Sequence, residues 1–266
     1  MPYPLNPQAP PASVSGTDCD RTIQRVSDDL WETHADWWIE GFTDGADPEY
    51  VEQIVPMAAD ELAGSSLVLD IGCGDGQISR VAASAGATVV GIDPTWNCVR
   101  VAAERGGGAT FARAGAVELP FADESFDTAV ACLVFEHIDE VDHAIAEVAR
   151  VLQPGGTFLF FLNHPILQAP GSVWVDDHLV DPPEQYWRLG PYLDETETIE
   201  QVELGVWIRF VHRPLSRYVN ALAANGLHVE KMLEPAPPAG FLSQSVGYEA
   251  SAAFPRLLFL RLRKTT

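Results

Sequence analysis

The sequence predicts an α/β protein with a seven-stranded, mostly parallel sheet that has helices on both faces. Apolar strands alternate with helices between residues 66 and 162, and nearly every position of these strands is apolar. Strands of this kind are buried on both faces, which requires helices on each side of the sheet. The pattern stops after Asn163 and resumes at Pro214, so an insertion is expected after the fifth strand. With 266 residues, of which 47% are apolar, the chain can form one large domain.

The expected elements follow one another in a regular order. Two helices come first, at about 22–41 and 47–62; the first carries spaced tryptophans and the second has Pro48 in its first turn. Strands are expected at 66–70, 88–92, 109–112, 126–132 and 157–162, with helices between them at 77–85, 94–104 and 141–152. A helix at 214–225, with Gly226 past its end, and strands at 227–233 and 257–262 follow the insertion.

These elements divide the chain into five predicted segments. A Pro-rich tail covers 1–20, N-terminal helices cover 21–64, a cofactor-binding core covers 65–163, an insertion covers 164–213, and a C-terminal helix with two strands covers 214–266. The tail lacks the basic start and the apolar run of a signal peptide. The insertion is rich in Pro, acidic and large aromatic residues and shows no helix of convincing length. We therefore expect a long loop that acts as a lid or a binding insertion.

Composition limits the classes of partner. Lys and Arg number 16 and Asp and Glu number 38, a net charge of −22 that would repel nucleic acids and anionic membranes. No apolar stretch is long enough to span a membrane. The four cysteines, Cys19, Cys73, Cys98 and Cys132, form no C-x-x-C pair. Neither a disulfide framework nor a metal site is expected, and reduced thiols indicate a cytoplasmic protein.

The strongest local signal is the run from Val68 to Gln77, in which an apolar strand leads into a glycine cluster and then a helix. Gly72 and Gly74 allow a sharp turn and a close approach of a ligand, at the strand end where open α/β sheets bind ligands. Asp93, at the end of the next strand, can accept hydrogen bonds from both hydroxyls of a ribose. A nicotinamide cofactor would also use such an acid, but its fingerprint is G-x-G-x-x-G and the spacing here is G-x-G-x-G.

Four runs in order, VLDIGCGDGQ, VVGIDP, FDTAVACLVFEHI and VLQPGGTFLF, resemble the class I S-adenosylmethionine-dependent methyltransferases. Within that family, the sequence is most similar to the group typified by the ubiquinone and menaquinone biosynthesis methyltransferases. The resemblance covers about Val68 to Leu162 and implies a Rossmann-like fold with an antiparallel last strand. It also implies S-adenosyl-L-methionine as cofactor and methyl transfer to a nitrogen, oxygen or carbon of a small molecule. Two alternatives are a relative that binds the cofactor without turnover and an NAD-dependent oxidoreductase.

The resemblance also implies which residues form the cofactor site. Asp70 would orient the glycine turn and reach the methionine amino group, Asp93 would hold the ribose, and Pro94 would touch the adenine. The full implied set is Asp70, Gly72, Cys73, Gly74, Asp93, Pro94, Ala116, Val117, Cys132, Leu133 and His137. Relatives often carry an acid at the position of Gly115, where it accepts from the adenine amino group. Because this chain has glycine there, we expect backbone groups or water to contact the adenine.

The acceptor side of the reaction leaves a weaker signal. Methyl transfer needs orientation and desolvation, and it needs a base only when the acceptor loses a proton near the transition state. His164, His212 and Tyr192 are the candidates for substrate contact or base, with loop, structural and packing roles as their alternatives. His164 follows the fifth strand, and we expect it to face the methyl donor. We expect the insertion and the N-terminal helix to close over the site from two sides. The helix would do so with Trp31, His34, Trp37 and Trp38, and packing in the core is the alternative for these tryptophans.

The insertion is compatible with two kinds of acceptor. Nine acidic residues lie between residues 176 and 203, with Arg188 the only Lys or Arg, which suits an amine-bearing molecule. The large aromatic residues of the insertion favour a flat, partly apolar molecule. We therefore expect an aromatic or amine-bearing small-molecule acceptor, no nucleic-acid or membrane partner, and a monomer or homodimer.

Overall fold

The computed structural model describes residues 30–244 and 248–265. The predicted tail and residues 22–29 of the first predicted helix lie outside the described residues. The described chain begins with two short helices, α2 (Leu30–Thr33) and α3 (Ala35–Phe42). A π-helical turn, η1 (Tyr50–Ile54), and helix α4 (Val55–Leu62) occupy the range of the second predicted helix. None of the described helices is both long enough and apolar enough to cross a membrane.

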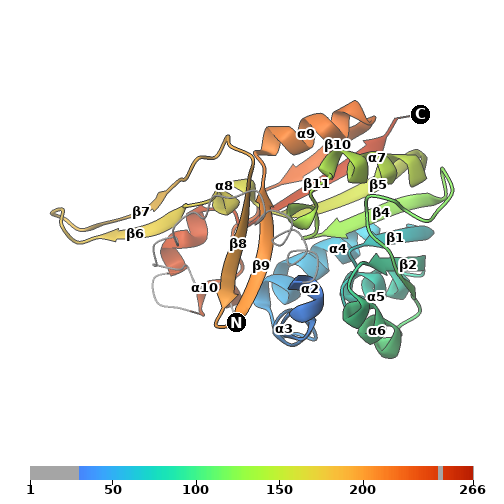
Figure 1. The fold of residues 1–266 in the computed structure, drawn as a ribbon, viewed down its shortest axis with the longest axis horizontal. Helices are drawn as coiled ribbons and strands as arrows, with labels where there is room; N and C mark the ends of the chain where they lie inside the picture. Colours follow the sequence, from blue (N-terminus) through green and yellow to red (C-terminus); the bar gives the residue numbers. More distant parts are fainter. Residues whose placement is uncertain (1–29, 245–247, 266) are drawn as a thin grey trace, which may run out of the picture.

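A seven-stranded sheet forms the centre of the molecule (Figure 1). Its strands are β1 (Leu67–Ile71), β2 (Thr88–Asp93), β3 (Thr110–Arg113), β4 (Phe126–Cys132), β5 (Leu152–Asn163), β10 (Leu227–Leu233) and β11 (Leu257–Lys264). The order across the sheet is β10-β11-β5-β4-β1-β2-β3. β1 to β5 are parallel, whereas β11 is antiparallel to both of its neighbours. This topology confirms the predicted α/β fold and the antiparallel last strand.

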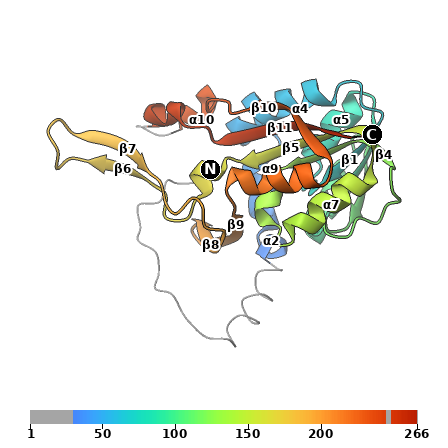
Figure 2. The ribbon, with the colours of Figure 1, turned by 90° about the horizontal axis from the view of Figure 1, so that it is seen from above.

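Helices cover both faces of the sheet (Figure 2). The main ones are α5 (Gln77–Ser84), α6 (Trp96–Arg105), α7 (Val141–Val151) and α9 (Leu215–Ala224). α4 and α5 pack on one face, and α7 and α9 pack on the other. Because strand side chains alternate between faces, Phe158 and Phe160 pack with α7, while Leu159 and Phe161 pack with α4. Two short helices between β10 and β11, α10 (Ala239–Leu242) and η3 (Tyr248–Ala253), are absent from the sequence prediction.

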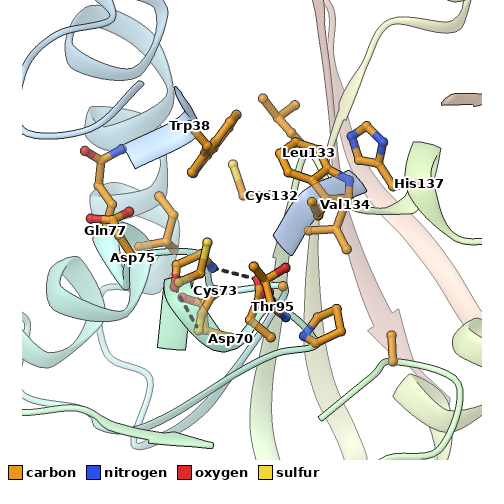
Figure 3. A pocket seen from close by; sticks show the side chains of 18 of the residues that line it. Trp38, Asp70, Cys73, Asp75, Gln77, Thr95, Cys132, Leu133, Val134 and His137 are labelled. Carbon is orange, nitrogen blue, oxygen red and sulfur yellow. Dashed lines mark hydrogen bonds between the residues drawn. The ribbon is translucent and has the colours of Figure 1, made fainter. Parts of the chain in front are cut away.

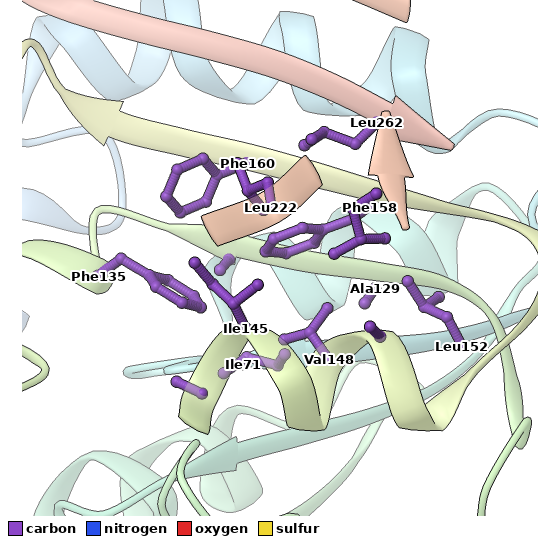
Figure 4. Close-up of a cluster of buried hydrophobic side chains, with 14 of the residues drawn as sticks. Ile71, Ala129, Phe135, Ile145, Val148, Leu152, Phe158, Phe160, Leu222 and Leu262 are labelled. Atoms are coloured by element: carbon purple, nitrogen blue, oxygen red, sulfur yellow. The ribbon is translucent and has the colours of Figure 1, made fainter. Parts of the chain in front are cut away.

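The larger apolar core lies between the sheet and the pair α7 and α9 (Figure 4). Ile145 and Val148 of α7 contribute to it together with Phe158 and Phe160 of β5, and all four side chains are fully buried. Phe135, just after β4, packs edge-on against Phe160 with 4.9 Å between ring centres. Burial of each such side chain stabilises the fold by about 1.5–3 kcal/mol, so this core fixes the strand ends that carry the site.

The insertion is not the long loop that the sequence predicted. It contains a short helix, α8 (Pro165–Gln168), and two antiparallel hairpins: β6 (Val173–Asp177) with β7 (Glu184–Arg188), and β8 (Thr196–Glu203) with β9 (Val206–His212). The β6–β7 hairpin projects away from the body of the protein (Figures 1 and 2). The prediction missed these strands because their many exposed acidic residues mask the alternation that marks a half-buried strand.

The β8–β9 hairpin packs against the N-terminal helices. Val202, Ile208 and Phe210 form a small buried cluster that contacts Trp31 and Trp37. The indole Nε1 of Trp37 also donates a hydrogen bond to the carboxylate of Glu203 at 2.8 Å. The insertion therefore supports the two helices.

Candidate functional site

The turn between β1 and α5 is built around glycines with left-handed backbone conformations. Gly72 has φ +67° and Gly74 has φ +52°. A Cβ on Gly72 would overlap the side chain of Val134, and one on Gly74 would lie 3.2 Å from Trp38 Nε1. The backbone N–H of Cys73 donates to the carbonyl of Ile92 at 2.9 Å, which ties the turn to β2. The turn thus presents bare backbone where a side chain would fill the space.

Asp93 joins this turn to the end of β2. Its Oδ2 accepts a hydrogen bond from the backbone N–H of Gly74 at 3.0 Å, and its Oδ1 accepts from that of Thr95 at 2.8 Å. Burial raises the pKa of Asp93, while these two hydrogen bonds act in the opposite direction. A carboxylate offers roughly four acceptor positions, so about two remain for a ligand with paired hydroxyl groups.

Asp70 fixes the start of α5 against β1. Its Oδ2 accepts a hydrogen bond from the hydroxyl of Ser79 at 2.6 Å. Burial raises the pKa of Asp70 to about 7, despite the hydrogen bond from Ser79. Asp75 also has a structural role, because its buried carboxylate forms ion pairs with Arg80 and Arg105. The two acids hold the glycine turn in a fixed relation to the helices that follow β1 and β2.

A cavity of about 970 Å³, including its open mouth, lies at the carboxyl ends of β1, β2 and β4 (Figure 3). Figure 3 shows Trp38 and His137 on one side of this cavity and Asp70 and Thr95 on the other. We call it the donor pocket. Leu133, directly after β4, lines it with a positive φ of +57°, a conformation that a leucine rarely adopts. Such strain is concentrated at functional sites in many proteins.

Ten of the eleven residues implied for the cofactor site line the donor pocket. They are Asp70, Gly72, Cys73, Gly74, Asp93, Pro94, Ala116, Cys132, Leu133 and His137. Val117 does not line it, and its residue surface is 40% exposed. Trp31 and Trp38, which were expected near the site, also line the pocket.

Sequence reasoning missed the other lining residues, which are Tyr50, Asp75, Gln77, Ile78, Thr95, Cys98, Ala114, Val134 and Ile138. Several of them could have been found, because Gln77 and Ile78 begin the helix after the glycine turn and Thr95 follows Pro94. Tyr50 carries no such signal. It reaches the pocket from η1, and its hydroxyl lies 3.8 Å from Cys132 Sγ.

His137 lies in the donor pocket as a neutral ring. Its Nδ1 donates to the backbone carbonyl of Arg209 at 2.7 Å, and its ring packs edge-on against Trp31. Burial lowers the pKa of His137 to about 4. Its neighbour Glu136 is also buried, and burial raises the pKa of that carboxyl to about 7. Glu136 accepts from Asn163 Nδ2 at 2.7 Å, which links the loop after β4 to the end of β5.

The three candidate bases do not line the donor pocket, contrary to the expectation that His164 faces the methyl donor. His164 is 5% exposed, its Nε2 donates to Glu234 at 2.7 Å, and its Nδ1 accepts from the N–H of Ile166. His212 is 2% exposed, and its Nε2 contacts the carbonyl of Tyr192 at 2.8 Å. The hydroxyl of Tyr192 accepts from the N–H of Leu215 at 2.9 Å. These contacts hold the ends of the insertion against the core.

A second pocket adjoins the donor pocket. The two share Trp31, Trp38, Tyr50, Leu133 and His137 as lining residues. The second pocket is completed by Phe42, Asp47, Glu49, Gln53, Ile54, Asn163, Arg256 and Leu257. We call it the side pocket. Within the described part of the chain, no residue of the insertion lines either pocket. The insertion therefore does not cover these pockets as the expected lid.

Known proteins resemble this chain in sequence. A family profile described as a methyltransferase domain (Methyltransf_11) matches residues 69–160. A demethylmenaquinone methyltransferase from Thermobifida fusca is 31% identical over 193 residues, which cover 65% of this chain and 81% of that protein. The chain belongs to the class I S-adenosylmethionine-dependent methyltransferases. A ubiquinone biosynthesis O-methyltransferase from Agrobacterium fabrum is 40% identical over 93 residues, 34% of this chain and 37% of that protein.

Solved methyltransferase structures resemble the fold. An S-adenosylmethionine-dependent methyltransferase from Mesorhizobium loti superposes with a TM-score of 0.66 and 28% identity, over 79% of this chain and 96% of that one. A second, from Listeria monocytogenes, has a TM-score of 0.68 at 22% identity, over 81% of this chain and 100% of that one, and supports the fold alone.

S-adenosylmethionine is therefore the cofactor of this methyltransferase, and the donor pocket fits it. The glycine turn leaves room that a Cβ would fill, and the buried Asp93 keeps acceptor capacity for two hydroxyl groups. Among residues 30–244 and 248–265, no three His, Cys, Asp or Glu residues are grouped as metal ligands. Cys73, Cys98 and Cys132 are buried free thiols, and Cys19 lies outside the described residues.

Proposed function

We propose that this methyltransferase transfers the methyl group to a small, flat molecule that occupies the side pocket. One observation carries the proposal: the donor pocket and the side pocket share Trp31, Trp38, Tyr50, Leu133 and His137. An acceptor in the side pocket would therefore lie next to the donor, with these shared side chains at the boundary between the two pockets. In-line displacement requires the two reacting atoms to come within about 3–3.5 Å, so the proposal requires a passage between these side chains.

The residues of the donor pocket would hold the cofactor by its polar parts. We assign Gly72, Cys73 and Gly74 to the amino-acid tail, since a side chain at either glycine would fill that space. We assign Asp93 to the ribose hydroxyls and Pro94 with Ala116 to the adenine. The bound cofactor supplies a methyl group on a cationic sulfur; the S–CH₃ bond breaks as the acceptor–CH₃ bond forms, and the bonding electron pair stays on the sulfur.

The protein's contribution to this displacement is orientation and the exclusion of water. Trp31, Trp38 and Tyr50 lie where the two pockets meet, and their rings offer apolar surface. A dry, apolar surrounding favours a reaction in which the positive charge of the sulfonium is lost. His137 is neutral because of its lowered pKa, so it adds no positive charge that would oppose the donor. An acceptor proton would leave to solvent or to a base.

Two further observations support a small acceptor. The net charge of −22 disfavours nucleic-acid substrates. The names of the Thermobifida fusca and Agrobacterium fabrum relatives refer to menaquinone and ubiquinone chemistry, which agrees with a flat, partly apolar acceptor here.

A turnover screen tests the proposal. The purified protein is incubated with methyl-labelled cofactor and a panel of phenols, amines and enolisable carbon acids, and label transfer is followed by mass spectrometry. Transfer to small planar molecules is expected, and the Trp38→Ala variant should lose it while the exposed control Trp207→Ala keeps it. Transfer only to protein or RNA would overturn the proposal.

A further inference from the structure

The side pocket combines aromatic side chains with a small set of polar ones. Trp38 and Phe42 stack with 4.7 Å between ring centres and an angle of 11° between their planes. Trp31 lines the same pocket. The polar residues are Asp47, Glu49, Gln53, Asn163 and Arg256. Aromatic faces favour a planar ligand, and the hydrogen-bonding state of each polar group shows which kind of polar substituent that ligand would carry.

Arg256 is the cationic side chain of this pocket. Its Nε donates to Glu49 Oε1 at 2.9 Å, and its guanidinium carbon lies 4.2 Å from the ring centre of Phe241. The side chain is held from two sides and is only 18% exposed. Its Nη1 and Nη2 donate to no residue that the structure describes. These two nitrogens are not among the buried side-chain atoms that lack a hydrogen-bond partner, so they remain accessible, and a guanidinium with two free Nη groups is suited to a ligand carboxylate.

The acidic groups of the side pocket each accept a hydrogen bond from within the protein. Asp47 Oδ1 accepts from the backbone N–H of Tyr50 at 3.0 Å, and Glu49 Oε1 accepts from Arg256. Burial raises the pKa of Asp47, and the backbone hydrogen bond from Tyr50 acts in the opposite direction. The amide nitrogen of Asn163 donates to Glu136. Among the described residues, the two Nη groups of Arg256 are the unpartnered cationic donors of the side pocket, and its acidic oxygens keep acceptor capacity as well.

We propose that the side pocket selects acceptors that carry a carboxylate, which the two Nη groups of Arg256 bind in bidentate fashion. Glu49 and Phe241 position the guanidinium, and Arg256 determines specificity without taking part in methyl transfer. This inference rests on the proposed function, because it names the acceptor class of the same site. For the two kinds of acceptor that the sequence left open, Arg256 favours a carboxylate, whereas Asp47 and Glu49 are the groups that an amine would contact.

Matched acceptors and two arginine variants test this inference. The probes are phenols that carry a carboxylate, a primary amide or an aminomethyl group on the same ring. Binding is measured by calorimetry on protein saturated with S-adenosylhomocysteine, and turnover is measured with labelled cofactor. The variants are Arg256→Gln and Arg256→Lys, and the control is Arg217→Gln, which breaks an ion pair with Asp142 outside both pockets.

We expect the acids to bind more tightly than the amides and the amines. Arg256→Gln should weaken acid binding about 10- to 100-fold and leave amide binding unchanged, because only the acid gains a charge-assisted pair. Arg256→Lys should recover part of the preference, since it keeps the charge and loses the fork. Equal binding of acids and amides, a preference for amines, or no acid binding to the loaded protein overturns the inference. Failure of S-adenosylhomocysteine to bind would instead refute the proposed function.

Discussion

Replacing Asp93 by alanine should weaken binding of the donor product more than any other single truncation in the donor pocket. Asp93 uses one acceptor position on each oxygen for Thr95 and Gly74 and keeps about two for a ribose. Each hydrogen bond from a ribose hydroxyl to this charged group is worth about 1.5–3 kcal/mol. Asp93→Ala should therefore weaken S-adenosylhomocysteine binding by about 3–6 kcal/mol, roughly 10²- to 10⁴-fold.

Isothermal titration calorimetry with S-adenosylhomocysteine measures this loss, and Asp127→Ala is the matched control. Asp127 also accepts hydrogen bonds from two backbone N–H groups, those of Ser66 and Leu67, but it lies at the opposite end of the strands. Its loss should lower stability without changing affinity. Urea unfolding of both variants establishes that they are folded. A folded Asp93→Ala protein that binds within about threefold of the wild type would refute the reasoning, as would an equal loss in Asp127→Ala.

Three further predictions concern stability and catalysis. Gly72→Ala should lower the free energy of unfolding by about 2–5 kcal/mol, and the control Gly64→Ala should lower it by about 1–2 kcal/mol. Both glycines have a positive φ, but only at Gly72 would the added methyl group meet a side chain, that of Val134. Equal losses in urea unfolding would contradict this prediction. Burial raises the pKa of Glu136 to about 7 from an ordinary 4.5. Between these two pH values the folded state holds a proton that the unfolded state releases. The free energy of unfolding should therefore fall by about 3 kcal/mol as the pH rises from 4.5 to about 7. Glu136→Gln should flatten that part of the stability curve, and an unchanged slope would count against the burial of the carboxyl. His164→Ala should lower the free energy of unfolding by about 1–3 kcal/mol, because it removes the hydrogen bonds to Glu234 and Ile166. The kcat of the folded variant should change less than about threefold. A fall in kcat of about 10²- to 10⁴-fold would instead indicate that His164 acts as a base.

The amino-acid sequence determined the sheet and most of the donor pocket. β4 lies at 126–132, as predicted, and the other strands of the sheet overlap their predicted positions, although β5 begins five residues early, at Leu152. Local patterns suffice for this, because a buried strand, a glycine turn and a helix start are each encoded by neighbouring residues. The same locality places Gly72 and Asp93 together, since parallel neighbouring strands end at one edge of the sheet.

Only the tertiary structure decided what lies around the cofactor edge. The side pocket joins Glu49, Asn163 and Arg256, which are far apart in the sequence. Asn163 and Arg256 meet because β11 pairs with β5, and Glu49 joins them through its ion pair with Arg256. The histidine predicted to face the methyl donor, His164, is instead buried against Glu234, and the predicted loop is a pair of hairpins of which β8–β9 supports α2 and α3. No local pattern encodes these contacts, because burial and pairing between distant segments are fixed only when the whole chain packs.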